Sequence, residues 1–260
     1  MNILRAILLR DIAIEMRYRF NLAAKVLNSL FYLTVFYFVA ALVPKGALVP
    51  NGGYFPFVFA GLAFSRFFAV CVGAGAEMVR QEQYWGTAES LFLSPVKPAL
   101  IAVSGIASRL LLAVLELILM GLAGIFIFGI KLSPLAILIV PLALIHAVMF
   151  AGVGLLSAGF IMRYKRGDPA AWILGIAVDL ASGVYFPVTL LPRPFAIAAA
   201  QLPTTSALNT WRMILLEGII PPTPVLVAQC LWAVALFGCG WYVFGILFDS
   251  ARRNATVGNY

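Results

Sequence analysis

Charged residues are scarce in this chain. Asp, Glu, Lys and Arg make up 11% of its 260 residues, whereas a soluble domain carries about 25%. Hydrophobic residues make up 63%, and the mean hydropathy is +1.02. They are grouped in runs close to the ~20 residues that cross a hydrocarbon core as a helix. The shortage of charge therefore excludes an ordinary soluble domain, and the continuous runs predict an all-α integral membrane protein rather than a β-barrel.

Histidine and cysteine are scarce too. His146 is the single histidine, and Cys71, Cys230 and Cys239 all lie within apolar runs, without Cys-x-x-Cys or Cys/His spacing. The sequence thus predicts buried, unreactive cysteines, a hydrogen-bonded interior histidine and no metal site. No Ser/His/Asp, His-x-x-x-His or paired-carboxylate pattern occurs either, which argues against a membrane-embedded enzyme.

The positive charges fall mostly on one side of the predicted membrane. Six transmembrane helices are predicted: Val26–Val43, Phe55–Val79, Ala107–Ile130, Leu135–Met162, Ala171–Leu190 and Val225–Phe248. An even number of spans places both termini on the same side. Most of the 18 Lys and Arg residues lie on that side; the others are Lys45, Lys131, Arg193 and Arg212 on the opposite side and Arg66 within a span. The positive-inside rule then predicts cytoplasmic termini for a single transmembrane domain, 1–260, in the plasma (inner) membrane.

Three segments outside the spans have a predicted shape. Residues 1–22 place Ile3, Ile7 and Ile14 at helical spacing beside arginines, which predicts an interfacial helix on the inner surface; a flexible basic leader is the alternative. This charged start also lacks the cleavage site of a signal peptide. Residues 191–224 are too apolar for a solvated loop and are broken by prolines, which predicts two short re-entrant helices on the outer side. The short connection at 131–134 predicts a tight hairpin of the third and fourth spans.

The segment 80–95, RQEQYWGTAESLFLSP, is a polar stretch between the second and third spans, on the predicted cytoplasmic side. Glu82 and Glu89 are two helical turns apart, and the final Ser-Pro pair marks a stop because proline cannot continue a helix. We expect one short helix along the membrane over 80–95, in which Tyr84 and Trp85 are anchors for a soluble partner. An ordinary solvated helix in the loop is the alternative.

Two stretches resemble the permeases of ABC-2 type transporters. Glu82–Val96, EQYWGTAESLFLSPV, resembles the pattern Glu-x-x-x-Gly-Thr-x-Glu-x-Leu-x-x-Ser/Thr-Pro that follows the second span in that family. Ser182–Arg212 is similar to the family's Gly-x-x-Phe-Pro…Leu-Pro segment after the fifth span. The two matches occur in the family's order, and the six-span layout extends the resemblance over nearly the whole chain. Ala88 departs from the family, which often has Leu, Ile or Val at that place.

The resemblance implies a transport subunit that is not itself an enzyme. It implies that 80–95 is a coupling helix, which binds in a cleft of a separate ATPase subunit. The N-terminal helix is expected to contribute to the same contact. The chain has no Gly-x-x-x-x-Gly-Lys-Ser/Thr loop, so the partner is expected to bind the ATP and Mg, and this chain is expected to hold no cofactor. Two permeases, expected to form a homodimer, pair with two ATPases. The implied coupling residues are Glu82, Tyr84, Trp85, Gly86, Thr87, Glu89, Ser94 and Pro95, and the outer gate candidates are Phe186, Pro187, Pro192 and Pro203.

Three charged residues lie near the middle of predicted spans: Arg66, Glu116 and Asp179. Each costs about 2.5–3.5 kcal/mol on the insertion scale, so it needs a partner or water. One interpretation is an ion pair of Arg66 with Glu116 or Asp179 that holds helices together; the other is a place in the substrate path. The aromatic residues of the first two spans are assigned to lipid-facing packing.

The expected function is export of an amphipathic substrate by alternating access, driven by ATP in the partner subunit. A lipid, a glycolipid, a polysaccharide and a hydrophobic drug all fit the sequence. The alternative is an ion-coupled transporter or channel whose path uses Arg66, Glu116, Asp179 and His146.

Overall fold

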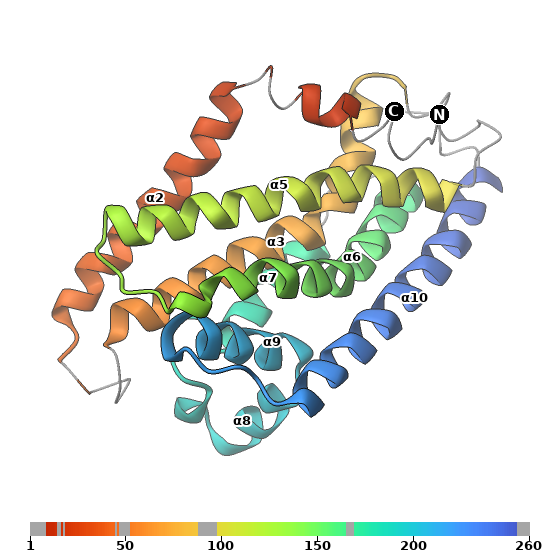
Figure 1. Cartoon of the computed structure of the whole chain (residues 1–260). Helices are drawn as coiled ribbons and strands as arrows, with labels where there is room; N and C mark the ends of the chain where they lie inside the picture. The colour runs from red at the N-terminus through yellow and green to blue at the C-terminus, as the bar shows by residue number, and fades with distance from the viewer. Residues whose placement is uncertain are drawn as a thin grey trace.

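The chain is all-helical, with no β-strand, in the parts that a computed structural model describes: residues 9–14, 17, 19–44, 46, 53–87, 98–164 and 169–253. The α-helices of Figure 1 are α2 (Arg19–Leu42), α3 (Tyr54–Tyr84), α5 (Pro98–Phe126), α6 (Ile139–Tyr164), α7 (Pro169–Ala181), α8 (Arg193–Ala200), α9 (Pro203–Arg212) and α10 (Thr223–Arg253). Between them lie two 3-10 turns, η1 (Pro134–Leu138) and η2 (Val188–Leu190), and a π-helical turn, η3 (Met213–Glu217). The predicted all-α class is confirmed for these residues.

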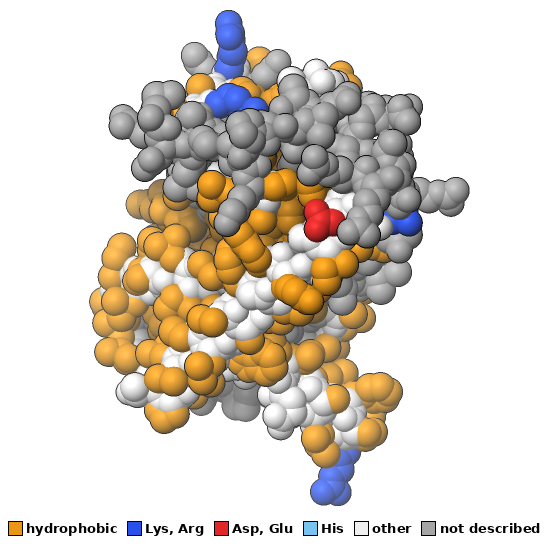
Figure 2. All heavy atoms as spheres, turned by 90° about the vertical axis from the view of Figure 1, so that its right-hand side faces the viewer, with side chains coloured by type: hydrophobic (Ala, Val, Ile, Leu, Met, Phe, Trp, Pro, Cys, Tyr) orange, Lys and Arg blue, Asp and Glu red, His pale blue; other side chains and the backbone are white. Residues whose placement is uncertain are grey.

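Four of these helical stretches are long and apolar enough to cross a membrane. They are Tyr54–Tyr84, Pro98–Phe126, Pro134–Arg163 and Thr223–Ala251. In Figure 2, hydrophobic side chains cover the middle of the visible face, and Lys and Arg lie toward its two ends. A surface of this kind suits a bilayer, in which an apolar core is bounded by polar headgroups. The chain therefore has the helices and the surface of a membrane-embedded protein.

The fifth predicted span is shorter than expected, whereas the apolar part of the first agrees with its prediction, Val26–Val43, to within one residue. The apolar part of α2, Val26–Leu42, has 17 residues. The helix α7 ends at Ala181, so the prediction of a span that continues to Leu190 is wrong. Gly183 stops the helix by adopting a left-handed backbone conformation, φ 77°, that residues with a side chain rarely take. The 13 residues of α7 measure about 20 Å, which is less than the ~30 Å of a hydrocarbon core.

Two other helix starts also differ from the prediction. The helix α2 already begins at Arg19, so residues 19–22 do not belong to the predicted interfacial helix. The helix α5 begins at Pro98, well before the predicted start at Ala107. Polar Ser104 is accommodated in its first turns because the hydroxyl donates to the carbonyl oxygen of Leu100, 2.7 Å away.

Glycines let α6 lie directly against both α3 and α10. A Cβ at Gly75 of α3 would overlap the carbonyl oxygen of Gly154, and a Cβ at Gly240 of α10 would overlap the carbonyl oxygen of Gly152. Because Gly152 and Gly154 are two residues apart, they face different neighbours on the helix circumference. Small residues of this kind allow close backbone approach between helices in membranes. The helix α6 is therefore the centre of the bundle.

The connection between the third and fourth predicted spans is short, as expected, but it covers 127–133 instead of 131–134, and the two helices are not each other's main packing partners. Only residues 127–133 separate α5 from η1. The helix α5, however, packs mainly along α3, and α6 packs mainly against α10 and α3. The backbone contacts at glycine hold α6 against α3 and α10, so the short connection does not make α5 its main partner.

The buried residues also correct two expectations about side chains. Four aromatic residues of α3 are buried in the core: Phe59, Phe64, Phe67 and Phe68. The prediction that they pack against lipid is therefore wrong. Cys71 is buried as predicted, but Cys230 and Cys239 are exposed on α10. An apolar residue on a membrane helix does not need to face the protein, because lipid is as apolar as the core.

The outer segment forms two short helices, as its prolines predict. Pro203 lies in the first turn of α9, where its missing N–H is not needed, and Pro192 is the residue before α8. In Figure 1, α8 and α9 lie at the end of the molecule where α3 begins. The end of α3, the start of α5 and the end of α10 meet at the opposite end, where Met78, Ile101 and Phe248 share one buried cluster. Immersion of α8 and α9 in the membrane stays a prediction.

The glycine contacts predict a difference between two substitutions on the same helix. Gly240→Ala should lower the midpoint of thermal unfolding in detergent, because the new methyl group overlaps α6 and overpacking costs about 1–3 kcal/mol. Gly238→Ala is the matched control, since a Cβ there meets nothing within 4 Å. The control should unfold at or above the wild-type midpoint. Equal midpoints for the two variants would contradict close packing of α6 on α10.

Candidate functional site

The end of α3 is built from the residues of the Glu-x-x-x-Gly-Thr pattern. The Gly86 N–H donates to the carbonyl of Gln83 at 3.0 Å, and the Thr87 N–H donates to the carbonyl of Glu82 at 3.0 Å. This pair of bonds is a Schellman motif, which needs a left-handed residue, and Gly86 supplies it with φ 69°. The helix therefore ends at Tyr84. The prediction of one separate helix over 80–95 is wrong, because residues 80–84 are the last turn of the long helix α3.

The carboxylate of Glu82 is held from two sides. The residue is buried, with 1% of its surface exposed, although it was predicted to face a partner. Arg10 Nη2 donates to Oε1 at 2.5 Å, and the Thr87 hydroxyl donates to Oε2 at 2.6 Å. Burial alone would lower the pKa of Arg10, but the hydrogen bonds and charges of Glu82 and Asp11 raise it overall. Glu82 thus joins the N-terminal segment to the end of α3.

The N-terminal segment also binds α5. Asp11 accepts a hydrogen bond from the Ser108 hydroxyl at 2.7 Å, and Arg10 Nε donates to the same carboxylate at 2.9 Å. Arg109 of α5 donates to the side-chain oxygen of Gln81. Three parts of the chain, 9–14, α3 and α5, are therefore tied together at one end of the bundle.

Two aromatic residues remain exposed beside this cluster. The exposed fraction is 89% for Tyr84 and 39% for Trp85. The Arg10 guanidinium carbon lies 5.9 Å from the centre of the Trp85 ring, within the range of a cation–π contact. A fixed helix end that presents two aromatic side chains has the character of a docking surface. The predicted coupling residues Glu89, Ser94 and Pro95 lie outside the described residues.

The charged residues within the spans are brought together only in part. Arg66 Nε lies 3.4 Å from Glu116 Oε2, so the predicted pairing of Arg66 with Glu116 is present and links α3 to α5. Asp179 instead accepts from the Tyr185 hydroxyl at 3.4 Å and from the hydroxyl of Ser65. The cavity beside Arg66 and Glu116 measures about 10 Å³, which is room for one water at most.

His146 is the centre of a buried hydrogen-bond chain. The Trp211 indole N–H donates to His146 Nδ1 at 2.9 Å, so Nδ1 is unprotonated, and Nε2 donates to the Gln229 side-chain oxygen at 3.2 Å. The Gln229 amide in turn donates to the hydroxyls of Thr210, 2.8 Å away, and Ser206, 3.3 Å away. The chain links α6, α9 and α10. The predicted role of His146 as a hydrogen-bonded interior residue is confirmed.

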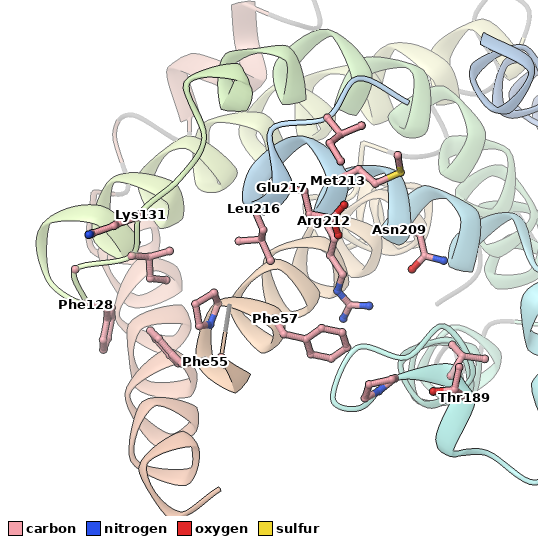
Figure 3. A pocket seen from close by; sticks show the side chains of 17 residues that line it. Phe55, Phe57, Phe128, Lys131, Thr189, Asn209, Arg212, Met213, Leu216 and Glu217 are labelled. Atoms are coloured by element: carbon pink, nitrogen blue, oxygen red, sulfur yellow. The ribbon is translucent and has the colours of Figure 1, made fainter. Parts of the chain in front are cut away.

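A large cavity opens at the other end of the bundle from Glu82. It measures about 1250 Å³ and lies between the start of α3, the connection after α5, the 187–189 turn and the α9–η3 segment. Figure 3 shows Arg212 and Asn209 reaching into it from α9, opposite Phe57 and Thr189. Of the predicted gate residues, Pro187 lines the cavity. Pro192 is the residue before α8, Pro203 is the first residue of α9, and Phe186 lies in the turn before Pro187.

No protein-family model matches the chain, and no curated protein matches it. The resemblance to ABC-2 permeases therefore rests on the two stretches of sequence, Glu82–Val96 and Ser182–Arg212.

Sequence reasoning misses several residues of these sites. Arg10 and Asp11 belong to an N-terminal stretch whose charges are expected to orient the chain and not to bind Glu82. Gln229 is a lone polar residue in the apolar run of α10, a signal that predicts a buried hydrogen-bond partner. Arg212 carries a weaker signal, because it follows a polar stretch of α9 and resembles an exposed cation.

The buried chain around His146 predicts coupled losses of stability. His146→Leu leaves the Trp211 N–H and the Gln229 oxygen without a partner, so thermal unfolding in detergent should show a loss of about 1–3 kcal/mol. Trp211→Phe should also lower stability. The double variant should lose about 1 kcal/mol less than the sum, because the second change removes a group that is already unpaired. Strictly additive losses would contradict the hydrogen bond between the two rings.

Proposed function

We propose that this chain is the membrane-spanning permease subunit of an ATP-driven ABC exporter. It moves an amphipathic substrate, such as a lipid, glycolipid, polysaccharide or hydrophobic drug, out of the cytoplasm or the inner leaflet by alternating access. It lies in the plasma (inner) membrane with both termini in the cytoplasm. The proposal is supported by the two matching stretches of sequence and by the four apolar helices.

The observation that carries the proposal is the construction of the helix end at Glu82–Thr87. The capping bonds and the Arg10–Glu82 pair fix the backbone there, while Tyr84 and Trp85 stay exposed. A soluble subunit that binds these two side chains gains a rigid attachment to α3. Because α3 runs without a break from Tyr54 to Tyr84, a displacement of its inner end is carried into the membrane.

The energy comes from a second protein in this proposal. The sequence has no phosphate-binding loop of the Gly-x-x-x-x-Gly-Lys-Ser/Thr type, so a separate ATPase subunit binds ATP and Mg. Two copies of the permease, as a homodimer, work with two ATPases. Closure of the ATPases moves the inner ends of α3 and opens the outer end at the gate candidates Phe186, Pro187, Pro192 and Pro203.

An ion-coupled transporter or channel receives less support. Its path would use Arg66, Glu116, Asp179 and His146. The cavity at the Arg66–Glu116 pair holds at most one water, and both nitrogens of the His146 ring are already engaged. Neither the Arg66–Glu116 pair nor the surroundings of His146 therefore offer a continuous route for ions.

Purification from the native membrane tests the proposal. A tagged chain in mild detergent should retain an ATPase subunit, seen as a second protein with a phosphate-binding loop and as ATP hydrolysis. Tyr84→Ala combined with Trp85→Ala should lower the retained ATPase by about tenfold or more, because exposed aromatic anchors dominate binding energy. Phe126→Ala is the matched control: this residue is 80% exposed but lies at the opposite end of the bundle from the attachment surface.

The control should retain the ATPase as the wild type does. The proposal fails if the wild-type chain transports without any ATPase, or if the double variant binds the ATPase as tightly as the Phe126→Ala control.

A further inference from the structure

We propose that the cavity beside Arg212 binds the anionic headgroup of an amphiphile whose apolar chain lies along the phenylalanines of the same cavity. This assignment rests on the proposed function, because it names the chemical class of the exported substrate.

Arg212 is a buried cation that forms no ion pair with any described residue. The residue is 8% exposed, and its Nη2 donates to the carbonyl oxygens of Gly183 at 2.7 Å and Val184 at 3.3 Å. Its guanidinium carbon lies 3.6 Å from the centre of the Phe57 ring. The structure records no ion pair for Arg212 among the described residues, and its Nε is buried without a hydrogen-bond partner there.

A cation in this position is stabilised by an anion. Two neutral carbonyls and a ring face offset only part of the cost of removing a guanidinium from water. Burial lowers the pKa of Arg212 to about 9, so the group is still protonated at neutral pH. Arg212 lines the large cavity, and Figure 3 shows its side chain projecting toward Phe57 and the open space. A bound phosphate or carboxylate supplies the missing negative charge.

The remaining polar groups agree with an anion. The charged residues that line the cavity are Arg212, Lys131 and Glu217, which leaves one positive charge in excess. Both Lys131 and Glu217 are exposed, and Arg212 alone is buried. Asn209 and Thr189 lie across from each other and offer an amide and a hydroxyl to headgroup oxygens (Figure 3). A cationic headgroup would meet two like charges instead.

The apolar lining fits a hydrocarbon chain. Most of the lining side chains are hydrophobic, among them Phe55, Phe57, Phe128, Met213 and Leu216. The volume of about 1250 Å³ exceeds that of a typical small-molecule pocket, about 300–1,000 Å³, so a headgroup and part of a chain both fit. The π-helical turn η3, which carries Met213 and Leu216, supports a binding site because such turns recur at functional sites.

Binding of dodecyl phosphate by the full chain tests this inference. The protein is placed in nanodiscs of phosphatidylcholine, and the heat of titration is measured with empty nanodiscs subtracted. Dodecyl phosphate should bind at least roughly tenfold more tightly than dodecyltrimethylammonium, which has a similar chain and the opposite charge. Inorganic phosphate should bind more weakly than dodecyl phosphate, because it lacks the apolar part.

Charge substitutions on the cavity wall distinguish a binding site from a purely structural role of Arg212. Asn209→Asp places a negative charge on an exposed cavity residue, leaves Arg212 in place, and should weaken binding of dodecyl phosphate by roughly tenfold. Gln201→Glu adds the same charge on the exposed residue after α8, outside the cavity lining, and should leave binding unchanged. Arg212→Lys should retain binding within a few-fold, whereas Arg212→Gln should lose it.

Three results would overturn the inference. One is equal binding of the anionic and cationic probes, and another is equal binding by the Asn209→Asp and Gln201→Glu variants. The third is binding of inorganic phosphate as tight as that of dodecyl phosphate, which would indicate a site for a free anion. The Tyr84→Ala variant should bind dodecyl phosphate as the wild type does, so loss of the ATPase and loss of this site are separate outcomes.

Discussion

Close backbone contact between α3, α6 and α10 is the constraint on which the rest of the structure depends. The glycine pairs Gly75–Gly154 and Gly152–Gly240 leave no room for side chains between these helices. Lipid tails are as apolar as leucine, so helices in a membrane gain little from burying apolar surface against one another, and close packing takes its place. With α6 fixed between its neighbours, α3 has a defined position along its whole length.

The helix α3 then connects the two candidate sites. Its 31 residues measure about 46 Å. Phe57 near its start faces Arg212 in the large cavity, and Glu82 near its end is bound by Arg10. In the proposed exporter, the ATPase acts on one end of this helix and the substrate binds beside the other. The hydrogen-bond chain through His146 holds α9, which carries Arg212, against α6 and α10.

The sequence predicts the helical class and the long spans because an apolar run in lipid must satisfy its backbone within one helix. Helix ends are predicted less well. A polar run suggests one helix over 80–95, whereas Gly86 ends α3 through a left-handed conformation that the pattern of polarity does not reveal. The cost of charge in a membrane predicts a partner for Arg66 but does not decide between Glu116 and Asp179; the structure shows Glu116. The partners of Glu82 and Arg212 cannot be predicted from the sequence, because these contacts join residues far apart in the chain. Glu82 contacts Arg10, and Arg212 contacts Gly183 and Phe57.

The orientation of α3 is the central claim, and labelling of single cysteines measures it most directly. In a background without Cys71, Cys230 and Cys239, Tyr84→Cys and Lys131→Cys each place one thiol at an exposed position at opposite ends of the bundle. A maleimide that does not cross membranes should label Lys131→Cys in intact cells and Tyr84→Cys only after the cells are permeabilised. Labelling of Tyr84→Cys in intact cells would place the proposed attachment surface outside the cell and contradict the account.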